Sequence, residues 1–563
     1  MAMKPSRIIL IVVLLIIAIV VAVSQLSQRV PEKTVLRLEV SGRVEEEDWP
    51  DFSAKVWEGD VIVFRRILEA LDRAKRDDNI AGVSLEIKNV GMGLAQIQEL
   101  RTKLAEFTAA GKWCTSYLEF GDNRSYYLAT ACPQVYLTPT STVFVTSLMG
   151  HSTFLRGALD KLRIYPDMYS IAEYKTAKNF FTEKKFTPAH REVVVSLLTT
   201  WQQQIVEGIG KGRSLTPEQA DELIRNGPYM AKEAVDKKLV DQLLFYDEYK
   251  EQVLKKKAGV DELKLLSWSD YVKRTSTPFG AAKIALVHAT GPIVTGSSGY
   301  EPGEGRYMGS DTVAKALRDA ADDDSIKAIV FRIESPGGSA LASEIIRREV
   351  VRAKTKKPVV VSMSNVAGSG GYWIAMSANK IVADPGTITG SIGVVFGKLN
   401  VKGLFDMLGL TSDYVALSPN ATFLYSYENF TPQQVERLMA MMQEIYDNFL
   451  DGVSQGRGIP KEEVHRIGRG RVWLGSQAKE LRLVDEVGGL DVATAIAKNL
   501  AKIPADQAVQ YEVFPREKTP LEQLEKLFES QSRGLLGAAR HSHWVQLLQE
   551  PVLVLMPFEL EVR

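Results

Sequence analysis

One serine in this chain stands in a setting that suits a nucleophile. Ser369 lies in a run of small residues, AGSGG at 367–371, which follows an apolar β-branched segment at 359–361 and precedes a helix-like segment at 372–378. A strand that turns sharply into a helix through glycines holds a serine hydroxyl outward, close to the free N–H groups of the helix. The same turn would also suit a serine that only caps the helix. This stretch by itself leaves both roles open.

A second glycine turn could supply N–H groups that stabilise an oxyanion. The segment FRIESPGGSAL at 331–341 joins a strand-like run to a helix-like run. No side chain covers the backbone amides of its two glycines, and two such amides can bind a developing negative charge. We expect Gly338 and Gly370 to be the two donors, with Gly337 as the alternative to Gly338.

In combination and at this spacing, the SPGG and GSGGYW motifs resemble those of the signal peptide peptidase (protease IV) family of membrane-anchored serine proteases. The resemblance is to the long, two-repeat form and covers nearly the whole chain. It implies an α/β fold in which a βα unit of the crotonase/Clp-protease type occurs twice. It also implies a homotetramer that cleaves remnant signal peptides and other unstructured apolar peptides on the periplasmic side of the bacterial inner membrane.

Length and composition fit this class and exclude others. With 563 residues, two domains or one duplicated unit are expected. Lys plus Arg and Asp plus Glu both number 69, so the zero net charge does not favour nucleic acid as a partner. We expect no nucleotide cofactor and no metal, because the chain has no GxxxxGK(S/T) motif, no strand-coupled GxGxxG motif and no His-rich or Cys-rich cluster. Cys114 and Cys132 are either free thiols or one disulfide.

The N-terminus predicts a membrane anchor. Residues 8–23 are uninterrupted apolar residues that would form a helix about 24 Å long, and uncharged neighbours extend the segment to residue 26. Lys4 and Arg7 precede it, so residues 1–7 should stay in the cytoplasm and the rest of the chain should lie outside. A cleaved signal peptide is the alternative, although the apolar run is long for one.

Beyond the anchor, the sequence predicts a tandem duplication. Strand-like and helix-like runs alternate, which is typical of a largely parallel sheet covered by helices. The segment DNI at 78–80 recurs 246 residues later as DSI at 324–326, and LVD at 239–241 recurs 244 residues later at 483–485. Thr-Pro pairs at 187–188 and 431–432 each predict a helix start. The predicted segments are a first repeat at 34–265, a linker at 266–282, a second repeat at 283–505, and a tail at 506–563 whose apolar residues 552–556 predict a docking strand.

The duplication points to a base for the serine. The position that matches Ser369 in the first copy is Asn123, so the first copy lacks a nucleophile. The family pattern places a lysine in a Tyr-Lys-Thr/Ser-Ala motif of the first copy, which here surrounds Lys175. The matching residue of the second copy is Ala421. Each copy keeps what the other has lost, and the resemblance therefore implies a dyad of Lys175 and Ser369 across the duplication.

A lysine can act as a base only when its amine is neutral. At the reference pKa near 10.4, about one lysine in 2,500 is neutral at pH 7. Burial against apolar groups lowers the pKa, and Tyr174, Phe180 and Phe181 are candidates for this role, whereas a nearby carboxylate would raise the pKa again. Ser391, in TGSIG, resembles the serine that orients the lysine in this family; the alternative is an ordinary turn serine.

Two other classes of protein share parts of the pattern. Crotonase-fold acyl-CoA enzymes also use two glycine amides as an oxyanion hole, but they need neither a Ser–Lys pair nor a membrane anchor. A non-catalytic membrane scaffold is the second alternative. The sequence favours a serine endopeptidase that works by a Ser–Lys dyad and needs no cofactor.

Overall fold

The computed structural model describes residues 29–48, 61–275 and 280–516, apart from 302 and 304, together with the strand at 553–555. The predicted cytoplasmic segment at 1–7 and the predicted anchor at 8–26 lie outside these residues. Within the described part of the chain, no helix combines the length and the apolar character needed to cross a bilayer.

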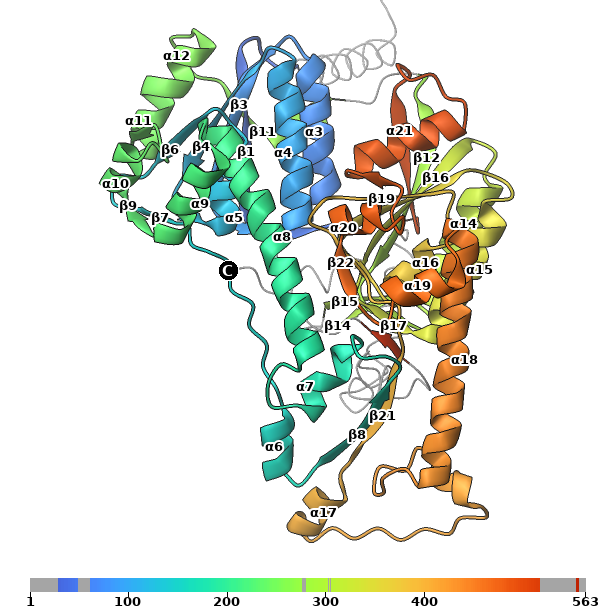
Figure 1. Cartoon of the computed structure of the whole chain (residues 1–563). Coiled ribbons are helices and arrows are strands. Elements are labelled where there is room, and N and C mark those ends of the chain that lie inside the picture. Colours follow the sequence, from blue (N-terminus) through green and yellow to red (C-terminus); the bar gives the residue numbers. More distant parts are fainter. Residues whose placement is uncertain are drawn as a thin grey trace, which may run out of the picture.

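The first repeat is a parallel sheet with helices packed around it (Figure 1). Its strand order is β10-β6-β4-β3-β1-β11, and every neighbouring pair is parallel. These strands are β1 (Thr34–Glu45), β3 (Ile80–Gly91), β4 (Trp113–Leu118), β6 (Gln134–Leu137), β10 (Gln242–Leu243) and β11 (Leu265–Ser267). The helices are α3 (Phe64–Arg76), α4 (Leu94–Ala109), α5 (Asn123–Ala129), α6 (Arg156–Lys161), α7 (Asn179–Thr182), α8 (Pro188–Arg213), α9 (Pro217–Asn226), α10 (Ala231–Asp236), α11 (Tyr246–Tyr249), α12 (Lys255–Ala258) and α13 (Trp268–Arg274).

The second repeat has the same arrangement. Its parallel strands run in the order β23-β19-β18-β16-β12-β24, and β20 and β22 extend the sheet beside β18. These strands are β12 (Ala282–Thr290), β16 (Ile326–Ser335), β18 (Val359–Gly368), β19 (Lys380–Ala383), β20 (Ile388–Gly390), β22 (Val472–Leu474), β23 (Glu486–Val487) and β24 (Val509–Phe514). The helices are α14 (Ser310–Asp322), α15 (Ala340–Ala353), α16 (Gly370–Ala375), α17 (Lys402–Leu408), α18 (Pro432–Arg457), α19 (Lys461–Ile467), α20 (Gly475–Glu480) and α21 (Leu490–Leu500).

Matching hydrogen bonds in the two copies confirm the predicted duplication. The hydroxyl of Tyr126 donates to the carbonyl of Leu239 at 2.6 Å, and that of Tyr372 donates to Leu483 at 2.8 Å. Both predicted helix starts are also present: Thr187 and Thr431 cap α8 and α18, each followed by proline. The same sequence pattern therefore builds the same βα unit twice.

The predicted C-terminal boundary of each repeat differs from the structure. The predicted linker at 266–282 contains most of β11, which pairs with β1, and all of α13, so these residues belong to the first repeat. Likewise β24 pairs with β12, so the second repeat extends into the predicted tail at 506–563. Both strands are short edge strands, and their sequences lack the apolar β-branched run that marks the central strands.

The symmetry is broken where the two repeats join. Strand β8 (Tyr165–Ser170) of the first repeat pairs antiparallel with β21 (Val395–Asn400) of the second. This pair lies at one edge of a small sheet ordered β14-β15-β13-β17-β25-β21-β8. The other members are β13 (Ile293–Val294), β14 (Gly299–Glu301), β15 (Gly305–Gly309), β17 (Gly337–Ser339) and β25 (Leu553–Leu555). The first repeat has a separate small sheet of β5 (Gly121–Asp122), β7 (Thr142–Phe144) and β9 (Tyr229–Met230), and β2 (Ile62–Val63) pairs with β1.

A buried charge network holds the two large sheets together. Arg332, on β16, lies 2.9 Å from the carboxylate of Glu46 and 3.0 Å from that of Glu99, both of the first repeat. Burial alone would raise the pKa of Glu46, but Arg332 and two neutral hydrogen-bond donors hold it at about 2. Removing one partner of such a buried pair typically costs about 3–5 kcal/mol. The network therefore fixes the first repeat against the strand that leads into the SPGG turn.

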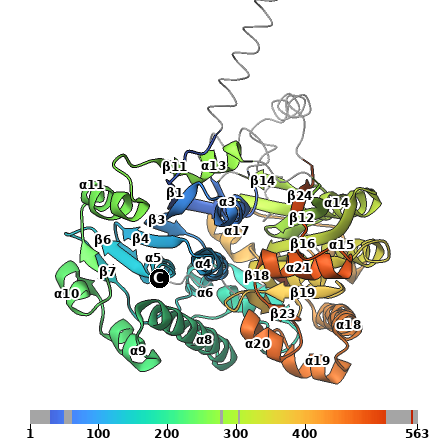
Figure 2. The ribbon, with the colours of Figure 1, turned by 90° about the horizontal axis from the view of Figure 1, so that it is seen from above.

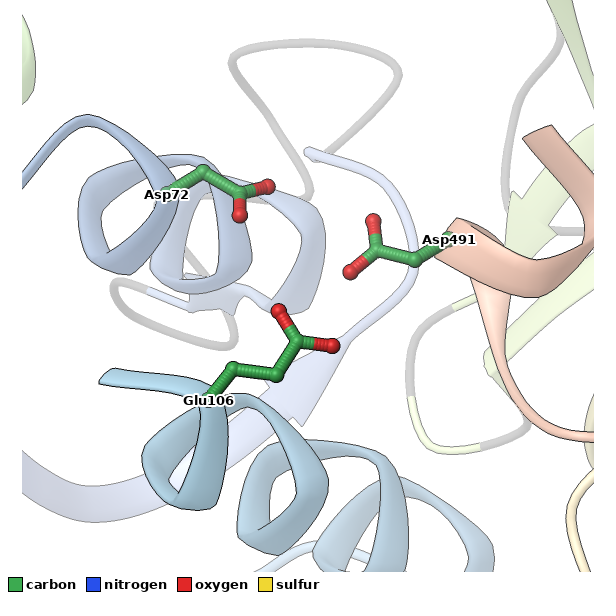
Figure 3. A group of neighbouring side chains, drawn as sticks. All are labelled: Asp72, Glu106 and Asp491. Carbon is green, nitrogen blue, oxygen red and sulfur yellow. The ribbon is translucent and has the colours of Figure 1, made fainter. Parts of the chain in front are cut away.

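A second ionic cluster joins helices of the two repeats, which lie side by side in Figure 2. Figure 3 shows Asp72 of α3, Glu106 of α4 and Asp491 of α21 pointing toward one another, close enough for a cation. The Nζ of Lys103 lies 2.7 Å from Asp72 and 3.7 Å from Glu106, and it also contacts Asp491. A lysine ammonium thus supplies the positive charge between these carboxylates, and the cluster is an inter-repeat contact.

Candidate active site

Ser369 stands at the predicted turn between a strand and a helix. It is fully buried between the end of β18 and the start of α16, in a strained conformation with φ 57° and ψ −112°. Its N–H donates to the carbonyl of Gly390 at 2.8 Å. The side chain makes no capping hydrogen bond to α16. Of the two roles that the sequence left open, the geometry disfavours the cap.

The first copy shows what the turn becomes without a nucleophile. Asp122 caps α5 there, because its carboxylate accepts the N–H of Ser125 at 2.7 Å. Asn123, at the position matching Ser369, accepts the N–H of Thr146 through its side-chain oxygen at 3.0 Å. The first repeat therefore has an ordinary capped helix at the position where the second repeat has the strained turn of Ser369.

Lys175 reaches Ser369 from the other repeat. Its Nζ lies 2.7 Å from Ser369 Oγ, 3.0 Å from Ser391 Oγ and 3.0 Å from the carbonyl oxygen of Ser391. The whole lysine side chain is buried, with 1% of its surface exposed. The structure therefore brings together the three side chains that the sequence singled out, whereas Ala421, the counterpart of Lys175, lies exposed in a 3-10 turn.

The pairing of β8 with β21 explains how the lysine arrives there. Ser170, at the end of β8, lies opposite Val395, and the N–H of Ile171 donates to the carbonyl of Val394 at 3.0 Å. Lys175 follows four residues after Ile171, and Ser391 precedes Val394 by three. The antiparallel register between the repeats thus sets the lysine beside the Ser391 turn.

Burial lowers the pKa of Lys175 well below its ordinary value. Among the described residues, no carboxylate contributes to this shift. The aromatic residues expected around the lysine are arranged differently: Phe180 and Phe181 pack on each other, and Tyr174 is only half-buried. Two glycines lie against the lysine instead: a Cβ built at Gly393 would lie 3.2 Å from Lys175 Cδ, and one built at Gly470 would lie 2.6 Å from Lys175 Cβ. Gly393 belongs to the TGSIG motif, whereas no sequence motif marks Gly470, and both glycines let the backbone pack directly against Lys175.

The glycines of the two motif turns meet beside Ser369. A Cβ built at Gly370 would lie 3.1 Å from the backbone nitrogen of Gly338, so the two residues are in contact. The N–H of Gly337 donates to Ser335 Oγ at 3.1 Å. Gly370 is the first residue of α16, where backbone N–H groups have no acceptor within the helix.

A strand from the predicted tail lies in the small sheet next to these glycines. Strand β25 pairs antiparallel with β17, placing Val554 opposite Gly338, and it pairs on its other side with β21 through Val395. The docking strand predicted at 552–556 is therefore present at 553–555. Without it, β17 and β21 would be two facing strand edges with a gap one strand wide.

Cys114 and Cys132 form a disulfide that links β4 to the segment after α5 in the first repeat. The sequence left this pairing open. Both residues belong to the first repeat, and the structure gives them no contact with Ser369 or Lys175.

A serine nucleophile needs a base within hydrogen-bond reach, and the buried contact between Ser369 and Lys175 meets this requirement of a serine hydrolase of the Ser–Lys type. Comparison with known proteins defines the family. The model of peptidase family S49 matches residues 107–261 and again residues 352–504. The chain therefore belongs to peptidase family S49 and is a serine protease with two S49 repeats in an α/β fold, as the sequence motifs predicted.

Individual relatives are similar over most of their length. The chloroplastic serine protease SPPA of Arabidopsis thaliana is 30% identical over 502 residues, which is 88% of this chain and 73% of that protein. Protease 4 of Salmonella typhi is 35% identical over 453 residues, or 78% and 72% of the two chains. A solved mutant of the 1510-N membrane-bound stomatin-specific protease aligns with 41% of this chain and 98% of its own at 17% identity, with a TM-score of 0.26.

Proposed function

We propose that this serine protease hydrolyses remnant signal peptides and other unstructured apolar peptides, with Ser369 as nucleophile and Lys175 as general base. The observation that carries the assignment is the 2.7 Å contact between Lys175 Nζ and Ser369 Oγ, made between two repeats. A relative from Enterococcus faecium that is 30% identical over 198 residues bears the name putative signal peptide peptidase, which supports the substrate class.

The contacts of the lysine suit a neutral amine. A neutral amine has two N–H donors and one lone pair, and Lys175 has three oxygen neighbours. Ser391 offers two acceptors, its carbonyl and hydroxyl oxygens, which take the two N–H groups. The lone pair then faces the hydroxyl of Ser369. Ser391 thus acts as the residue that orients the base.

The chemical steps follow from this arrangement. Lys175 removes the proton of Ser369 as Oγ attacks the carbonyl carbon of the scissile bond. The resulting ammonium gives this proton to the leaving amine, which leaves an acyl-enzyme on Ser369. Lys175, neutral again, takes a proton from the water molecule that attacks the ester, and gives it to Ser369 Oγ as the acid product leaves.

Gly338 and Gly370 are proposed to bind the oxyanion. The two glycines contact each other, Gly370 directly follows Ser369, and Gly370 begins a helix, where N–H groups have no acceptor within the helix. Gly338 is preferred to Gly337, because the N–H of Gly337 already donates to Ser335. Removing one such donor typically costs about 3–4 kcal/mol of transition-state stabilisation.

The position of β25 supports an extended peptide as substrate. A strand added between β17 and β21 runs past Gly338 and makes backbone hydrogen bonds on both sides, which is how strand addition recognises unfolded peptides. Folded proteins cannot offer such a strand. In the resting chain, β25 occupies this place and would compete with a substrate.

A proline in β25 should therefore increase activity on short peptides. Val554→Pro removes the central N–H of the strand and disfavours a position between two partners. We expect KM for a short apolar peptide to fall severalfold while kcat stays unchanged. Glu561→Pro, outside β25, is the matched control. An unchanged KM for Val554→Pro would show that β25 does not compete with substrate.

The remaining elements of the proposal concern location and assembly. Residues 8–26 are proposed to anchor the chain in the bacterial inner membrane, with Lys4 and Arg7 in the cytoplasm and both repeats on the periplasmic side. The assembled enzyme is proposed to be a homotetramer.

Substrate preference separates this proposal from the two alternatives. The full chain in detergent should cleave an apolar peptide of signal-sequence composition, should not turn over an acyl-CoA thioester, and should react with a fluorophosphonate probe at Ser369. Thioester turnover without peptide cleavage would favour a crotonase-type enzyme. If the chain shows no turnover and no labelling, a non-catalytic scaffold is the remaining alternative.

A further inference from the structure

One loop of the second repeat touches the segment that carries the base. This loop, residues 468–471, joins α19 to β22 and is called the bridging loop below. The N–H of Tyr174 donates to the carbonyl of Arg469 at 3.2 Å. Gly470 has φ +79°, and a Cβ built there would lie 2.4 Å from the backbone nitrogen of Lys175 and 2.6 Å from its Cα. Only glycine lets the bridging loop come this close to the lysine.

The opposite side of the bridging loop holds the turn that orients the lysine. The N–H of Gly470 donates to the carbonyl of Ile392 at 2.7 Å, and the N–H of Ser391 donates to the carbonyl of Arg471 at 2.8 Å. A Cβ built at Gly393 would lie 2.9 Å from Gly470 Cα. The bridging loop therefore contacts both the lysine backbone and residues 391–393, the turn whose Ser391 oxygens contact the lysine amine.

Side chains of the bridging loop also contact Tyr174, the residue that precedes Lys175. The guanidinium groups of Arg469 and Arg471 lie 5.2 Å and 5.0 Å from the centre of the Tyr174 ring. The Tyr174 hydroxyl donates to Glu192 of α8 at 2.9 Å, and Arg471 pairs with the same carboxylate. Arg469 pairs with Glu173 at 3.3 Å. Together these groups form a cover over the Tyr174 ring, next to Lys175 in the sequence, and this cover links both repeats.

We propose that the bridging loop is the positioning element of the base: it fixes Lys175 against the Ser391 turn and excludes water from the lysine amine. The inference rests on the proposed dyad and adds residues to it that touch neither substrate nor the reacting atoms. The ionisable groups around the cover are Glu173, Tyr174, Glu192, Tyr446, Arg469 and Arg471.

Gly470→Ala tests the positioning role. The added methyl group must push the lysine backbone and the bridging loop apart, which admits water to the amine and moves it from Ser369. A displacement of about 1 Å can cost 100-fold in rate, so we expect kcat to fall about 100-fold with KM within about twofold of wild type. Because hydration favours the ammonium form, the midpoint of the pH–rate profile should rise by about one unit or more.

Gly458→Ala is the matched control. Gly458 also has a left-handed conformation, with φ +64°, but a Cβ there meets no heavy atom within 4 Å. This variant carries a comparable backbone strain without touching the lysine, so its kcat and pH midpoint should equal those of wild type.

A second variant covers the case in which Gly470→Ala fails to fold. Glu192→Ala removes an exposed side chain that ties Tyr174 and Arg471 together. We expect a smaller rise of the pH midpoint and an unchanged KM. If both variants fold and keep the wild-type midpoint and kcat, the role of the bridging loop is overturned. If Ser369→Ala and Lys175→Ala are inactive in the same assay, the dyad itself still stands. An active Ser369→Ala would instead overturn the proposed function itself.

Discussion

Replacing Ser369 by alanine is expected to abolish peptide hydrolysis. Loss of the nucleophile in a serine protease lowers kcat on the order of 10⁶-fold, because no other group can form the acyl-enzyme. The fold should survive, since the hydroxyl makes its described hydrogen bond to Lys175 and the change removes a single atom. The measurement is kcat for an apolar peptide together with the thermal unfolding midpoint of the purified variant.

Ser116→Ala provides the matched control for this variant. Ser116 is as deeply buried as Ser369, and its hydroxyl donates to the carbonyl of Ala129 at 2.7 Å in the first repeat. This variant should retain wild-type kcat. Appreciable turnover by pure Ser369→Ala, at more than about one thousandth of the wild-type rate, would mean that another residue attacks the substrate.

Lys175→Arg should be as inactive as Lys175→Ala. A guanidinium keeps its positive charge at every pH in the working range and has no lone pair to accept the proton of Ser369. It is also larger than the amine, and the side chain it would replace is fully buried, with Gly393 against its Cδ. We expect kcat to fall on the order of 10⁴-fold or more for both variants, as for the loss of a general base in other serine proteases.

Lys178→Arg is the matched control, because it also replaces a lysine of this segment by an arginine. Lys178 lies three residues further along the same segment, and its replacement should leave kcat close to wild type. An active Lys175→Arg variant would contradict the dyad, because Ser369 would then need a base that the structure does not place beside it.

The parts of the site that could be predicted are those that depend on short sequence motifs. The glycines around Ser369 and the SPGG turn mark sharp connections between strand and helix, and the structure has both turns where the pattern predicts them. Lys175 could be singled out because its motif resembles the family pattern, and the duplication supports that choice: Asn123 and Ala421 differ from their counterparts at the two positions that the dyad requires.

Other parts depend on contacts between distant segments. Gly470 resembles any glycine of a surface loop in sequence, and its closeness to Lys175 arises only when the two repeats pack together. Phe180 and Phe181 looked suited to cover the lysine, but they pack against each other. The sequence predicts a linker and a tail where the structure has the edge strands β11 and β24, because such strands are defined by pairing with a neighbour and not by their own sequence.

The central claim is that Lys175 acts as a neutral base on Ser369, and one measurement tests it directly. The second-order rate of labelling of Ser369 by a fluorophosphonate is recorded against pH for wild type and for Lys175→Arg. The account predicts that the wild-type rate rises tenfold per pH unit up to a midpoint well below 10.4, because burial lowers the lysine pKa, and then stays constant. The variant should label slowly and without this midpoint. A wild-type midpoint near 10.4, or the same midpoint in the variant, would contradict the assignment of Lys175 as the base.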